Sequence, residues 1–295
     1  PLPCSRLNPL ISFRNKATDE PPLRISLPAV LPLLLALGAC ASQQLAEDRT
    51  ISVESTAIPA AASPGPEMSG LLRSTSPSYV TLTVAEARRA GKVGQDDPGL
   101  AVTSGSGFVV DDDGHVLTAG HVAIKDGFTV TAHAADGHIY SGKVISIQPN
   151  NDMALIKLAR FEGRPVEPAA SACMQKGEPV FSLGKPHAEG DTARLGQVES
   201  MSFGRAVNYN GFGYPDAVVL HMNTKKGESG GPLFNSSGRL AGMVVSTLSD
   251  GNGRPLNLAH AVPVTALAKF LCSHTSCSAQ WQQLSRQSTQ SCPGA

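Results

Sequence analysis

The sequence predicts an all-β fold, and three observations support that class. Of its 295 residues, 29 are glycine and 22 are proline, so residues that form turns are frequent along the whole chain. Long amphipathic helical patterns are scarce. From Gly105 onward, short runs rich in β-branched and aromatic residues alternate with turn signals such as DDDGH, NSSGR and SDGNGRP. Roughly a dozen strands at this spacing fit two small barrels or a sandwich.

Composition narrows the class of protein further. The chain carries 24 basic and 24 acidic residues, and 41% of its residues are hydrophobic. A chain of this length and hydrophobicity can bury a sizeable core, which excludes a disordered protein. Because the net charge is zero, nothing in the composition indicates a nucleic acid as partner.

The first forty residues predict export. The stretch RISLPAVLPLLLALGAC places Arg24 ahead of an apolar run that ends at Leu37, which is short for a membrane span and suits a signal peptide. The last four residues of the stretch, LGAC, resemble the lipobox of bacterial lipoproteins, in which the cysteine is lipidated and becomes the new terminus. We therefore predict a lipoprotein-type signal peptide over residues 1–40 and lipidation at Cys40.

The predicted anchor implies a location. Ala41 after the cysteine resembles sorting to the outer membrane of a Gram-negative bacterium, so we expect a lipid-anchored protein that faces the periplasm. An uncleaved anchor and an ordinary secretory signal are the alternatives, both of which also export the chain. A start at Met68 would instead give a cytoplasmic protein.

Residues 41–77 are rich in Ala, Ser, Pro and Thr, and we expect them to form a disordered tether. The following TVAEARRAG predicts a short helix with Thr83 as its N-cap and Gly91 as its stop. Near the other end, PVTALAKFL predicts a helix over residues 263–271, with one apolar face against the domain. The tail, residues 273–295, is too short for another folded domain.

Three segments carry residue types that can perform nucleophilic catalysis together. His121 ends LTAGH, Asp152 opens DMALIKL, and Ser229 lies within GESGGP. Each residue alone has an ordinary structural explanation as a core, cap or turn residue. A serine nucleophile, however, needs a histidine base and a carboxylate that orients the base, and the chain supplies all three.

These residues lie in long motifs that resemble the trypsin-like (chymotrypsin-fold) serine peptidases, most closely the bacterial HtrA/Deg group. The motifs are GSGFVVDDDGHVLTAGHV (105–122), NNDMALIKL (150–158) and GESGGPLFNSSGRLAGMV (227–244). The resemblance implies a protease domain over residues 78–272 with two perpendicular six-stranded barrels and the C-terminal helix. The first barrel would cover about 78–168 and the second about 175–262. The short tail implies that the PDZ domains usual in Deg proteases are absent.

The resemblance and the chemistry together predict a serine endopeptidase that needs no cofactor and acts on protein or peptide substrates. His121 would accept the Ser229 proton, Asp152 would hold the imidazole, and the amides of Gly227 and Ser229 would form the oxyanion hole. The alternative is a catalytically silent protease fold that serves as a binding or envelope-structural module.

Two positions near the serine bear on specificity and activation. By the family's loop pattern, Asn223 would lie near the base of the primary specificity pocket, and a neutral residue there argues against strict selection of Lys or Arg. Glu228 occupies the position where many animal relatives carry an aspartate that pairs with a new amino terminus after cleavage. No such activation site is evident in the sequence.

The cysteines favour an oxidising compartment. Beyond the signal segment and Cys40 there are four cysteines, and an even number in an exported protein indicates two disulfides with three possible pairings. The resemblance implies a bridge from the segment between the barrels to the C-terminal helix, hence Cys173 with Cys272 or Cys277; free buried thiols are the alternative. CSHTSC has no second ligand pair of zinc-site spacing, so we predict no metal. The four cysteines are Cys173, Cys272, Cys277 and Cys292.

Overall fold

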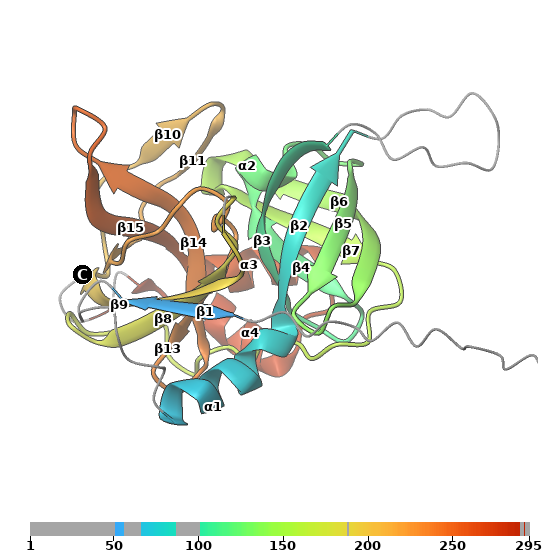
Figure 1. Cartoon of the computed structure of the whole chain (residues 1–295), viewed down its shortest axis with the longest axis horizontal. Coiled ribbons are helices and arrows are strands. Elements are labelled where there is room, and N and C mark those ends of the chain that lie inside the picture. Colours follow the sequence, from blue (N-terminus) through green and yellow to red (C-terminus); the bar gives the residue numbers. More distant parts are fainter. Residues whose placement is uncertain (1–50, 56–65, 87–100, 188, 290–291, 293–295) are drawn as a thin grey trace, which may run out of the picture. The chain divides into compact units, whose positions relative to one another are not determined.

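The computed structural model describes residues 51–55, 66–86, 101–187 and 189–289, together with Cys292. Two barrels of antiparallel strands account for most of these residues, and helices pack beside them (Figure 1). The predicted signal segment 1–40 and Cys40 lie outside the described residues. None of the helices in the described ranges is long and apolar enough to cross a bilayer.

The first barrel is a closed ring of six strands in the order β2-β3-β4-β7-β6-β5. Its interior is apolar because alternate residues of each strand point inward, as the burial of every second residue in β5 illustrates. Leu82, Phe108, Leu117 and Ile156 are at most 2% exposed and fill it. The strands are β2 (Tyr79–Ala85), β3 (Ala101–Val109), β4 (His115–Ala119), β5 (Thr129–Ala134), β6 (Ile139–Gln148) and β7 (Met153–Leu158).

The second barrel also closes with six strands, in the order β8-β9-β12-β15-β14-β13 and back to β8. Its separate apolar interior includes Val198, Leu220, Leu233 and Ala259. The predicted class of two six-stranded barrels is therefore confirmed. The strands are β8 (Pro179–Gly184), β9 (Thr192–Ser200), β12 (Val218–His221), β13 (Pro232–Asn235), β14 (Leu240–Ser249) and β15 (Pro255–Pro263).

Short elements between the barrel strands surround the predicted site. The helix α2 (Gly120–Ala123) follows β4, and the 3-10 turn η2 (Pro149–Asn151) precedes β7. A small hairpin of β10 (Val207–Tyr209) and β11 (Phe212–Tyr214) projects from the second barrel. Because these elements come from both barrels, the predicted residues can meet where the barrels contact each other.

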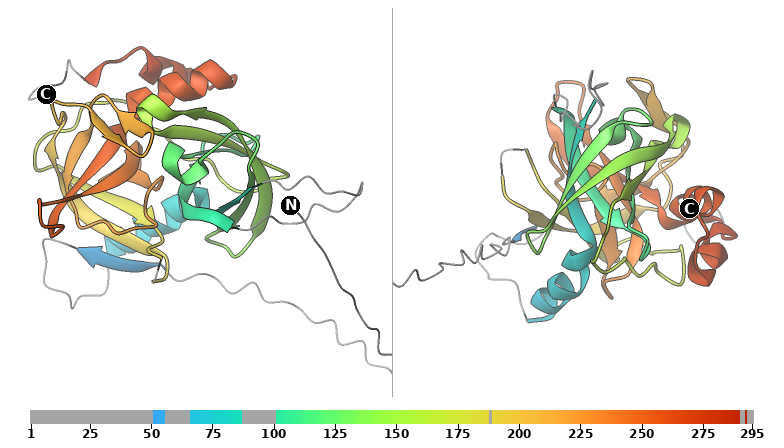
Figure 2. Two further views of the ribbon diagram at one scale, coloured as in Figure 1. Left: turned by 90° about the horizontal axis from the view of Figure 1, so that it is seen from above. Right: turned by 90° about the vertical axis from the view of Figure 1, so that its right-hand side faces the viewer.

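The helix α3 (Val264–His274) covers nearly the span predicted for the C-terminal helix, and it ends three residues later. The predicted apolar face is buried, with Val264, Leu267 and Leu271 at most 1% exposed. The His274 ring also bonds to the Ser146 hydroxyl of β6 at 2.9 Å, so α3 contacts both barrels. A second helix, α4 (Ala279–Ser285), lies within the predicted tail, and both helices lie along one side of the barrels (Figure 2).

The expectation of a disordered tether over residues 41–77 is wrong in two places. Ser52–Ser55 form β1, a strand that pairs in parallel with β9 of the second barrel. Pro66–Thr75 form the helix α1, followed by the 3-10 turn η1 (Ser76–Ser78). Met68, Leu71 and Leu72 of α1 pack against the apolar core. These three residues stand at the i, i+3, i+4 spacing of a helix, a period that the polar composition around them outweighed in the sequence analysis.

The helix predicted to start at Thr83 is also wrong where the structure describes it. Thr83 and Ala85 belong to β2, which pairs with β3 on one side and β5 on the other. The alternation of Val80, Leu82 and Val84 between these neighbours outweighs the capping pattern, since burying three apolar side chains stabilises more than one cap. The predicted stop, Gly91, lies outside the described residues.

The two disulfides form, but the pairing expected for Cys173 is wrong. Cys173 pairs with Cys292 near the C-terminus, and Cys272 pairs with Cys277 at the end of α3. The chain leaves α3 at Thr275 and turns back at once, which brings the Cα atoms of Cys272 and Cys277 within 5.1 Å. Cys173 is therefore left for the cysteine that follows α4.

Candidate active site

His121 is held directly against Asp152. It lies in α2, immediately after β4, and its ring Nδ1 is 2.9 Å from Asp152 Oδ2. The backbone N–H of His121 donates a second hydrogen bond to Asp152 Oδ1 at 2.9 Å. The imidazole side chain remains 26% exposed, while the carboxylate is fully buried. Asp152 thus fixes the position of the ring and leaves the Nε2 edge of His121 for a partner.

Asp152 owes its position to an unusual backbone conformation. It follows η2 with φ of 47°, in the left-handed region, which Asp tolerates better than most residues. Its N–H donates to the carbonyl of Pro149 at 3.2 Å, and β7 begins at the next residue. The turn therefore lifts the carboxylate out of the strand direction and towards His121.

Ser229 lies in a tight loop between β12 and β13 that only glycine can build. Gly227 and Gly230 have φ of 100° and 84°. A Cβ on Gly227 would lie 2.3 Å from the carbonyl oxygen of Lys185, and one on Gly230 would lie 2.3 Å from that of Ser106. A Cβ on Gly231 would likewise lie 2.3 Å from the carbonyl oxygen of Leu183. The glycines flanking the serine are therefore required both for backbone conformation and for space.

The amides of Gly227 and Ser229 are positioned as a pair of donors. Within the described ranges neither N–H has a hydrogen-bond acceptor, whereas the amides of Glu228, Gly230 and Gly231 donate to backbone carbonyls. Two neighbouring amides without acceptors can bind an oxyanion, as predicted for this loop. The Ser229 hydroxyl donates to the carbonyl of Val245 at 3.3 Å, so it must rotate before it can give its proton to His121.

The first barrel supports this loop through Ser106 of β3. The Ser106 hydroxyl donates to the carbonyl of Gly227 at 2.9 Å and accepts the N–H of Lys185 at 3.2 Å. The Ser106 amide also donates to the carbonyl of Ser229 at 2.9 Å. Sequence reasoning did not single out Ser106, although it lies in the GSGF motif. These bonds join the loop that carries the serine to the barrel that carries His121 and Asp152.

The hairpin of β10 and β11 covers the other side of the His121–Asp152 pair. The Tyr209 hydroxyl donates a short hydrogen bond to Asp152 Oδ2, and it lies 3.3 Å from His121 Nδ1. Burial, together with the nearby charge of Asp152, raises the pKa of Tyr209 above its usual range, so the hydroxyl stays protonated and donates. The Asn210-Gly211 pair signals the hairpin turn, but nothing in the sequence indicates that it folds onto Asp152.

A cavity of about 540 Å³ adjoins the site. Tyr209 lines it, and so does Ser246, which follows Val245 in the chain; the carbonyl of Val245 accepts the hydrogen bond of the Ser229 hydroxyl. Asn223, the predicted pocket residue, is partly buried and does not line this cavity. A larger cavity of about 820 Å³ lies beside α3 and contains none of the three predicted residues. The smaller cavity is lined by Phe203, Arg205, Ala206, Val207, Tyr209, Ser246, Thr247, Leu248, Ser249 and His260.

Among the described residues, one group of side chains offers closely spaced metal-ligand atoms. Asp111 and Asp113 lie in the turn between β3 and β4, His115 is the first residue of β4, and their ligand atoms lie within 4.8 Å of one another. His115 Nδ1 is already paired with Asp111 Oδ2 at 2.7 Å. Because this cluster does not include His121, Asp152 or Ser229, the geometry gives it no part in a reaction at Ser229.

Comparison with known proteins agrees with the fold. Residues 105–243 match the trypsin-like peptidase domain family. The chain is 30% identical over 217 residues to Protease Do-like 5, chloroplastic, of Arabidopsis thaliana, covering 68% of this chain and 66% of that protein. It is 33% identical over 179 residues to a probable periplasmic serine endoprotease DegP-like of Brucella suis, covering 59% of this chain and 34% of that protein.

Solved structures show the same architecture. The structure of Deg5 aligns with a TM-score of 0.52 and 25% identity, covering 69% of this chain and 91% of that one. The active form of the Rv3671c protease from M. tuberculosis aligns with a TM-score of 0.57 and 24% identity, covering 79% of this chain and 95% of that one.

The fold and the matched domain define a trypsin-like serine peptidase. Among these, the chain belongs to the HtrA type, as its DegP-like and Do-like relatives indicate. It spans from about a third to about two thirds of the length of these curated relatives.

Proposed function

We propose that the protein is a serine endopeptidase that hydrolyses peptide bonds in protein or peptide substrates through an acyl-enzyme on Ser229. The observation that carries the proposal is the pairing of His121 with buried Asp152, beside a loop that offers two amides without acceptors among the described residues. A binding module would not need a buried carboxylate that is hydrogen-bonded to a partly exposed histidine. Nor would it need strained glycines on both sides of one serine.

The proposed reaction has two halves, the formation and the hydrolysis of the acyl-enzyme, and both halves use the same catalytic groups. His121 Nε2 accepts the Ser229 proton as the oxygen attacks the carbonyl carbon, and it then gives that proton to the leaving amine. Asp152 stabilises the imidazolium that forms between these steps. The amides of Gly227 and Ser229 stabilise the oxyanion. In the second half a water molecule loses a proton to His121 as its oxygen attacks the acyl carbon, and His121 returns that proton to Ser229 Oγ as the acyl bond breaks and the carboxylate product leaves.

Substrate selection is proposed to occur in the cavity next to Val245. Its lining combines the aromatic Phe203 and Tyr209 with hydroxyl groups from β14 and the cation of Arg205. Among the described residues that line it there is no carboxylate, so it has no anionic partner for a Lys or Arg side chain. Asn223, which we predicted near the base of the pocket, is neutral as well. We therefore propose a preference for apolar or small side chains.

We further propose that the protein is exported and held to the membrane by lipid on Cys40. Several DegP-like relatives are named as periplasmic, and Cys173, Cys272, Cys277 and Cys292 pair in two disulfides, which is typical of an oxidising compartment. The mass of the mature N-terminus in its native host tests this proposal. A diacylated or triacylated Cys40 is expected, and an unlipidated terminus at any other residue contradicts it.

One observation favours the alternative of a latent or silent protease fold. The Ser229 hydroxyl is bonded to Val245 and not to the imidazole, so the three groups are not aligned for proton transfer. Catalytic hydrogen bonds are often poorly aligned until substrate binds. We therefore retain the endopeptidase as the proposed function.

Fluorophosphonate labelling followed by intact-mass measurement separates these two functions. These probes phosphonylate serines that are activated by a neighbouring base, with loss of the leaving group. We expect one adduct on the folded wild-type chain and none on Ser229→Ala. A folded wild-type chain that shows no adduct and does not cleave unfolded protein would refute the endopeptidase.

A further inference from the structure

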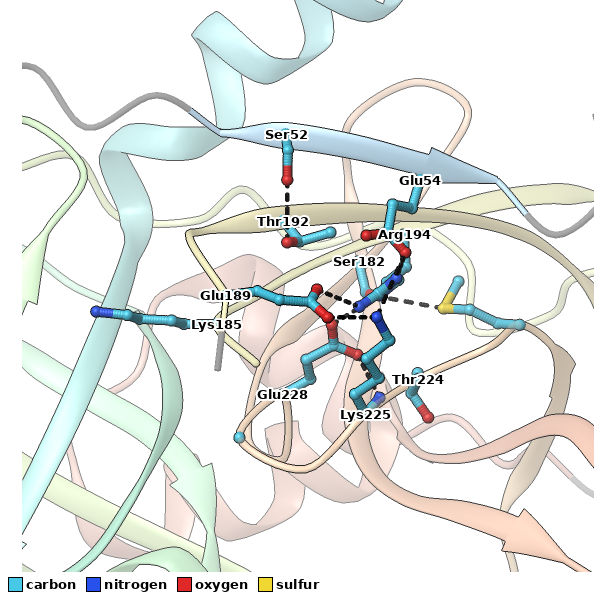
Figure 3. A network of polar contacts seen from close by, with 12 residues as sticks. Ser52, Glu54, Ser182, Lys185, Glu189, Thr192, Arg194, Thr224, Lys225 and Glu228 are labelled. Atoms are coloured by element: carbon cyan, nitrogen blue, oxygen red, sulfur yellow. Dashed lines mark hydrogen bonds and ion pairs between the residues drawn. The ribbon is translucent and has the colours of Figure 1, made fainter. Parts of the chain in front are cut away.

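A buried cluster of charges lies directly behind the loop that carries Ser229, and Arg194 is at its centre. Arg194 belongs to β9, and its side chain is only 2% exposed. Figure 3 shows Glu54, Glu189, Glu228 and Lys225 gathered around it. The mechanism proposed above uses none of these residues.

Arg194 holds the residue that lies between the two oxyanion-hole amides. Its Nε donates to Glu228 Oε1 at 2.7 Å, and Glu228 is itself only 2% exposed. The other carboxylate oxygen, Oε2, accepts the backbone N–H of Lys225 at 2.8 Å. The Glu228 amide donates back to the carbonyl of Lys225 at 3.2 Å. The carboxylate therefore closes the turn from Lys225 to Glu228 and ties it to β9.

The hydrogen bonds of the Glu228 side chain bear on the direction of the two amides. Glu228 lies between Gly227 and Ser229, so a movement of its backbone rotates both adjoining peptide groups. Gly227 has the freedom of a glycine at φ of 100°, and its amide has no acceptor in the described part of the chain. The carbonyl of that peptide group, which belongs to Lys226, accepts the N–H of His187 at 3.1 Å. The fixed Glu228 side chain adds a restraint from the other side of Gly227.

The N-terminal strand β1 supplies a carboxylate to the outer end of the Arg194 side chain. In the parallel pairing of β1 with β9, Glu54 stands opposite Arg194, and its carboxylate pairs with Arg194 Nη1. Nη2 lies 3.5 Å from Glu189 Oε2, an ion pair without a hydrogen bond. Lys225 Nζ binds Glu189 at 2.5 Å. β1 thus brings a third carboxylate to a guanidinium that already pairs with Glu228 and Glu189.

We propose that Arg194 is a positioning residue for the peptidase reaction. It holds Glu228, and through Glu228 the amides of Gly227 and Ser229, in the geometry that binds the oxyanion, and docking of β1 completes its charge environment. The proposal rests on the proposed function of Ser229. Arginine suits this place because its planar fork binds two carboxylates in fixed directions, which an ammonium group cannot do.

A purely stabilising role is the competing explanation, and the position of the pair argues against it. A buried ion pair is a poor source of stability, since well-packed apolar residues often replace it without loss. Here the anion is adjacent to the nucleophile and accepts a hydrogen bond from the same loop. The two explanations differ in what they predict for kcat.

The test compares full-length variants in peptide hydrolysis and in hydrogen exchange of the loop. Arg194→Met removes the fork, and Arg194→Met with Glu228→Gln also removes the charge that would be left buried and unpaired. Arg194→Lys restores the charge without the fork. The matched control is Arg239→Met, which removes an arginine of the same barrel that pairs with exposed Glu167. Each folded variant is measured for kcat, KM and the exchange of peptides that cover residues 224–231.

We expect kcat of Arg194→Met and of the double variant to fall by about two to three powers of ten, the usual effect of a lost oxyanion-hole donor. KM should change by less than about threefold, because a donor aimed at the transition state contributes little to substrate binding. Exchange in the loop should accelerate. Arg194→Lys should recover part of kcat, and Arg239→Met should match the wild type. If the single variant does not fold, the double variant carries the test.

Two results overturn the proposal: a double variant with wild-type kcat, or loop exchange that is unchanged when the Arg194 fork is removed. A wild-type chain that hydrolyses no substrate refutes the proposed function instead, and the exchange measurement still decides whether Arg194 holds the loop. Glu54→Gln tests the contribution of β1. It should lower kcat in the same direction but by less, because Glu228 remains bound to Arg194; an unchanged kcat would remove β1 from the proposal.

Discussion

Gly227 meets two separate requirements with one residue. Its φ of 100° is costly for any residue with a Cβ, and the space that a Cβ would fill is taken by the Lys185 carbonyl and the His187 ring. Either requirement alone would favour glycine. Together they make the direction of the Gly227 amide sensitive to the smallest substitution.

We expect Gly227→Ala to fold and to lose about two to three powers of ten in kcat, because the loop must shift to admit the methyl group and the amide loses its direction. Gly253→Ala is the matched control, since Gly253 also has a positive φ of 79° but has no atom within 4 Å of the place where a Cβ would lie. The measurement is kcat and KM on one peptide substrate. Similar losses in both variants would show that backbone strain, and not the oxyanion hole, is responsible.

Tyr209 is the second residue with a specific effect on the site, through the hydrogen bond of its hydroxyl to Asp152. Tyr209→Phe removes a donor to a buried carboxylate, and a hydrogen bond to a charged group contributes about 1.5–3 kcal/mol. We therefore expect fluorophosphonate labelling to slow by at least about tenfold. Tyr140→Phe removes the hydroxyl of a tyrosine on β6, outside the hairpin, and it should label at nearly the wild-type rate. A Tyr209→Phe rate equal to that of Tyr140→Phe would contradict the assignment.

At the scale of elements, the hairpin of β10 and β11 rests on a buried histidine. The Tyr214 hydroxyl bonds to His260 Nδ1 at 2.8 Å, and the Phe203 ring lies 4.3 Å from the His260 ring. Burial, together with the nearby charge of Arg205, lowers the pKa of His260 to about 4. The hairpin that holds Tyr209 over Asp152 is therefore supported by a histidine that must stay neutral.

The sign of the pH dependence follows from this lowered pKa. The unfolded chain protonates His260 near its ordinary pKa of 6.5, whereas the folded chain resists until about 4. The contribution to stability is thus complete above about pH 6.5 and is lost as the pH falls towards 4, with an upper limit of about 3 kcal/mol. His260→Gln keeps an acceptor for Tyr214 and removes the titration.

We expect the free energy of unfolding of His260→Gln to fall less than that of the wild type between pH 6.5 and 4. Denaturant unfolding at a series of pH values measures the difference. His138→Gln serves as control, because His138 is 65% exposed and its replacement should leave the wild-type slope. Parallel curves for the wild type and His260→Gln would show that His260 is already protonated in the folded chain.

Elements differ in how well their sequences predict them. The strands around His121, Asp152 and Ser229 are regular, with apolar residues that alternate or run continuously, so their pattern predicts both the class and the motifs. β1 has four residues, SVES, and its partner β9 lies about 140 residues further on, so no local pattern marks it. The capping pattern at Thr83 misleads because it is local, while the pairing of β2 with β3 and β5 is not.

The candidate site is predictable to the extent that its residues lie in contiguous motifs. His121, Asp152 and Ser229 each stand in a recognisable stretch, and Gly227 follows from the serine loop. Tyr209, Ser106 and Arg194 act through contacts between distant segments, and no spacing along the chain identifies such partners. The cysteines illustrate the same limit, since their pairing depends on the turn after α3 and on α4.

At the scale of the whole molecule, the two barrels are joined at the loop that carries Ser229 and again along α3. Ser106 binds the loop from the first barrel, and Ser146 of β6 binds His274 at the end of α3. The C-terminal segment is fastened to the second barrel, where Cys292 is buried in the same apolar cluster as Val180 and Leu220. The long disulfide thus closes the chain from the segment between the barrels to its C-terminal end.

The two disulfides should therefore contribute unequally to stability. Cys173 and Cys292 are 119 residues apart, and Cys272 and Cys277 only 5. Loop entropy in the unfolded chain gives upper limits of about 5 kcal/mol for the long bridge and about 2 kcal/mol for the short one. Replacing both cysteines of one bridge by serine, and then those of the other, gives two variants to compare by denaturant unfolding under oxidising conditions.

We expect the variant without the long bridge to lose at least about twice as much free energy of unfolding as the variant without the short one. Both variants should retain fluorophosphonate labelling, because neither bridge contacts His121, Asp152 or Ser229. Equal losses would indicate that the C-terminal segment stays docked in the unfolded ensemble or that α4 holds it without the bridge. Loss of labelling in a folded variant would instead show that removing the bridge changes the loop that carries Ser229. The contacts of α3 with both barrels provide the physical route for such an effect.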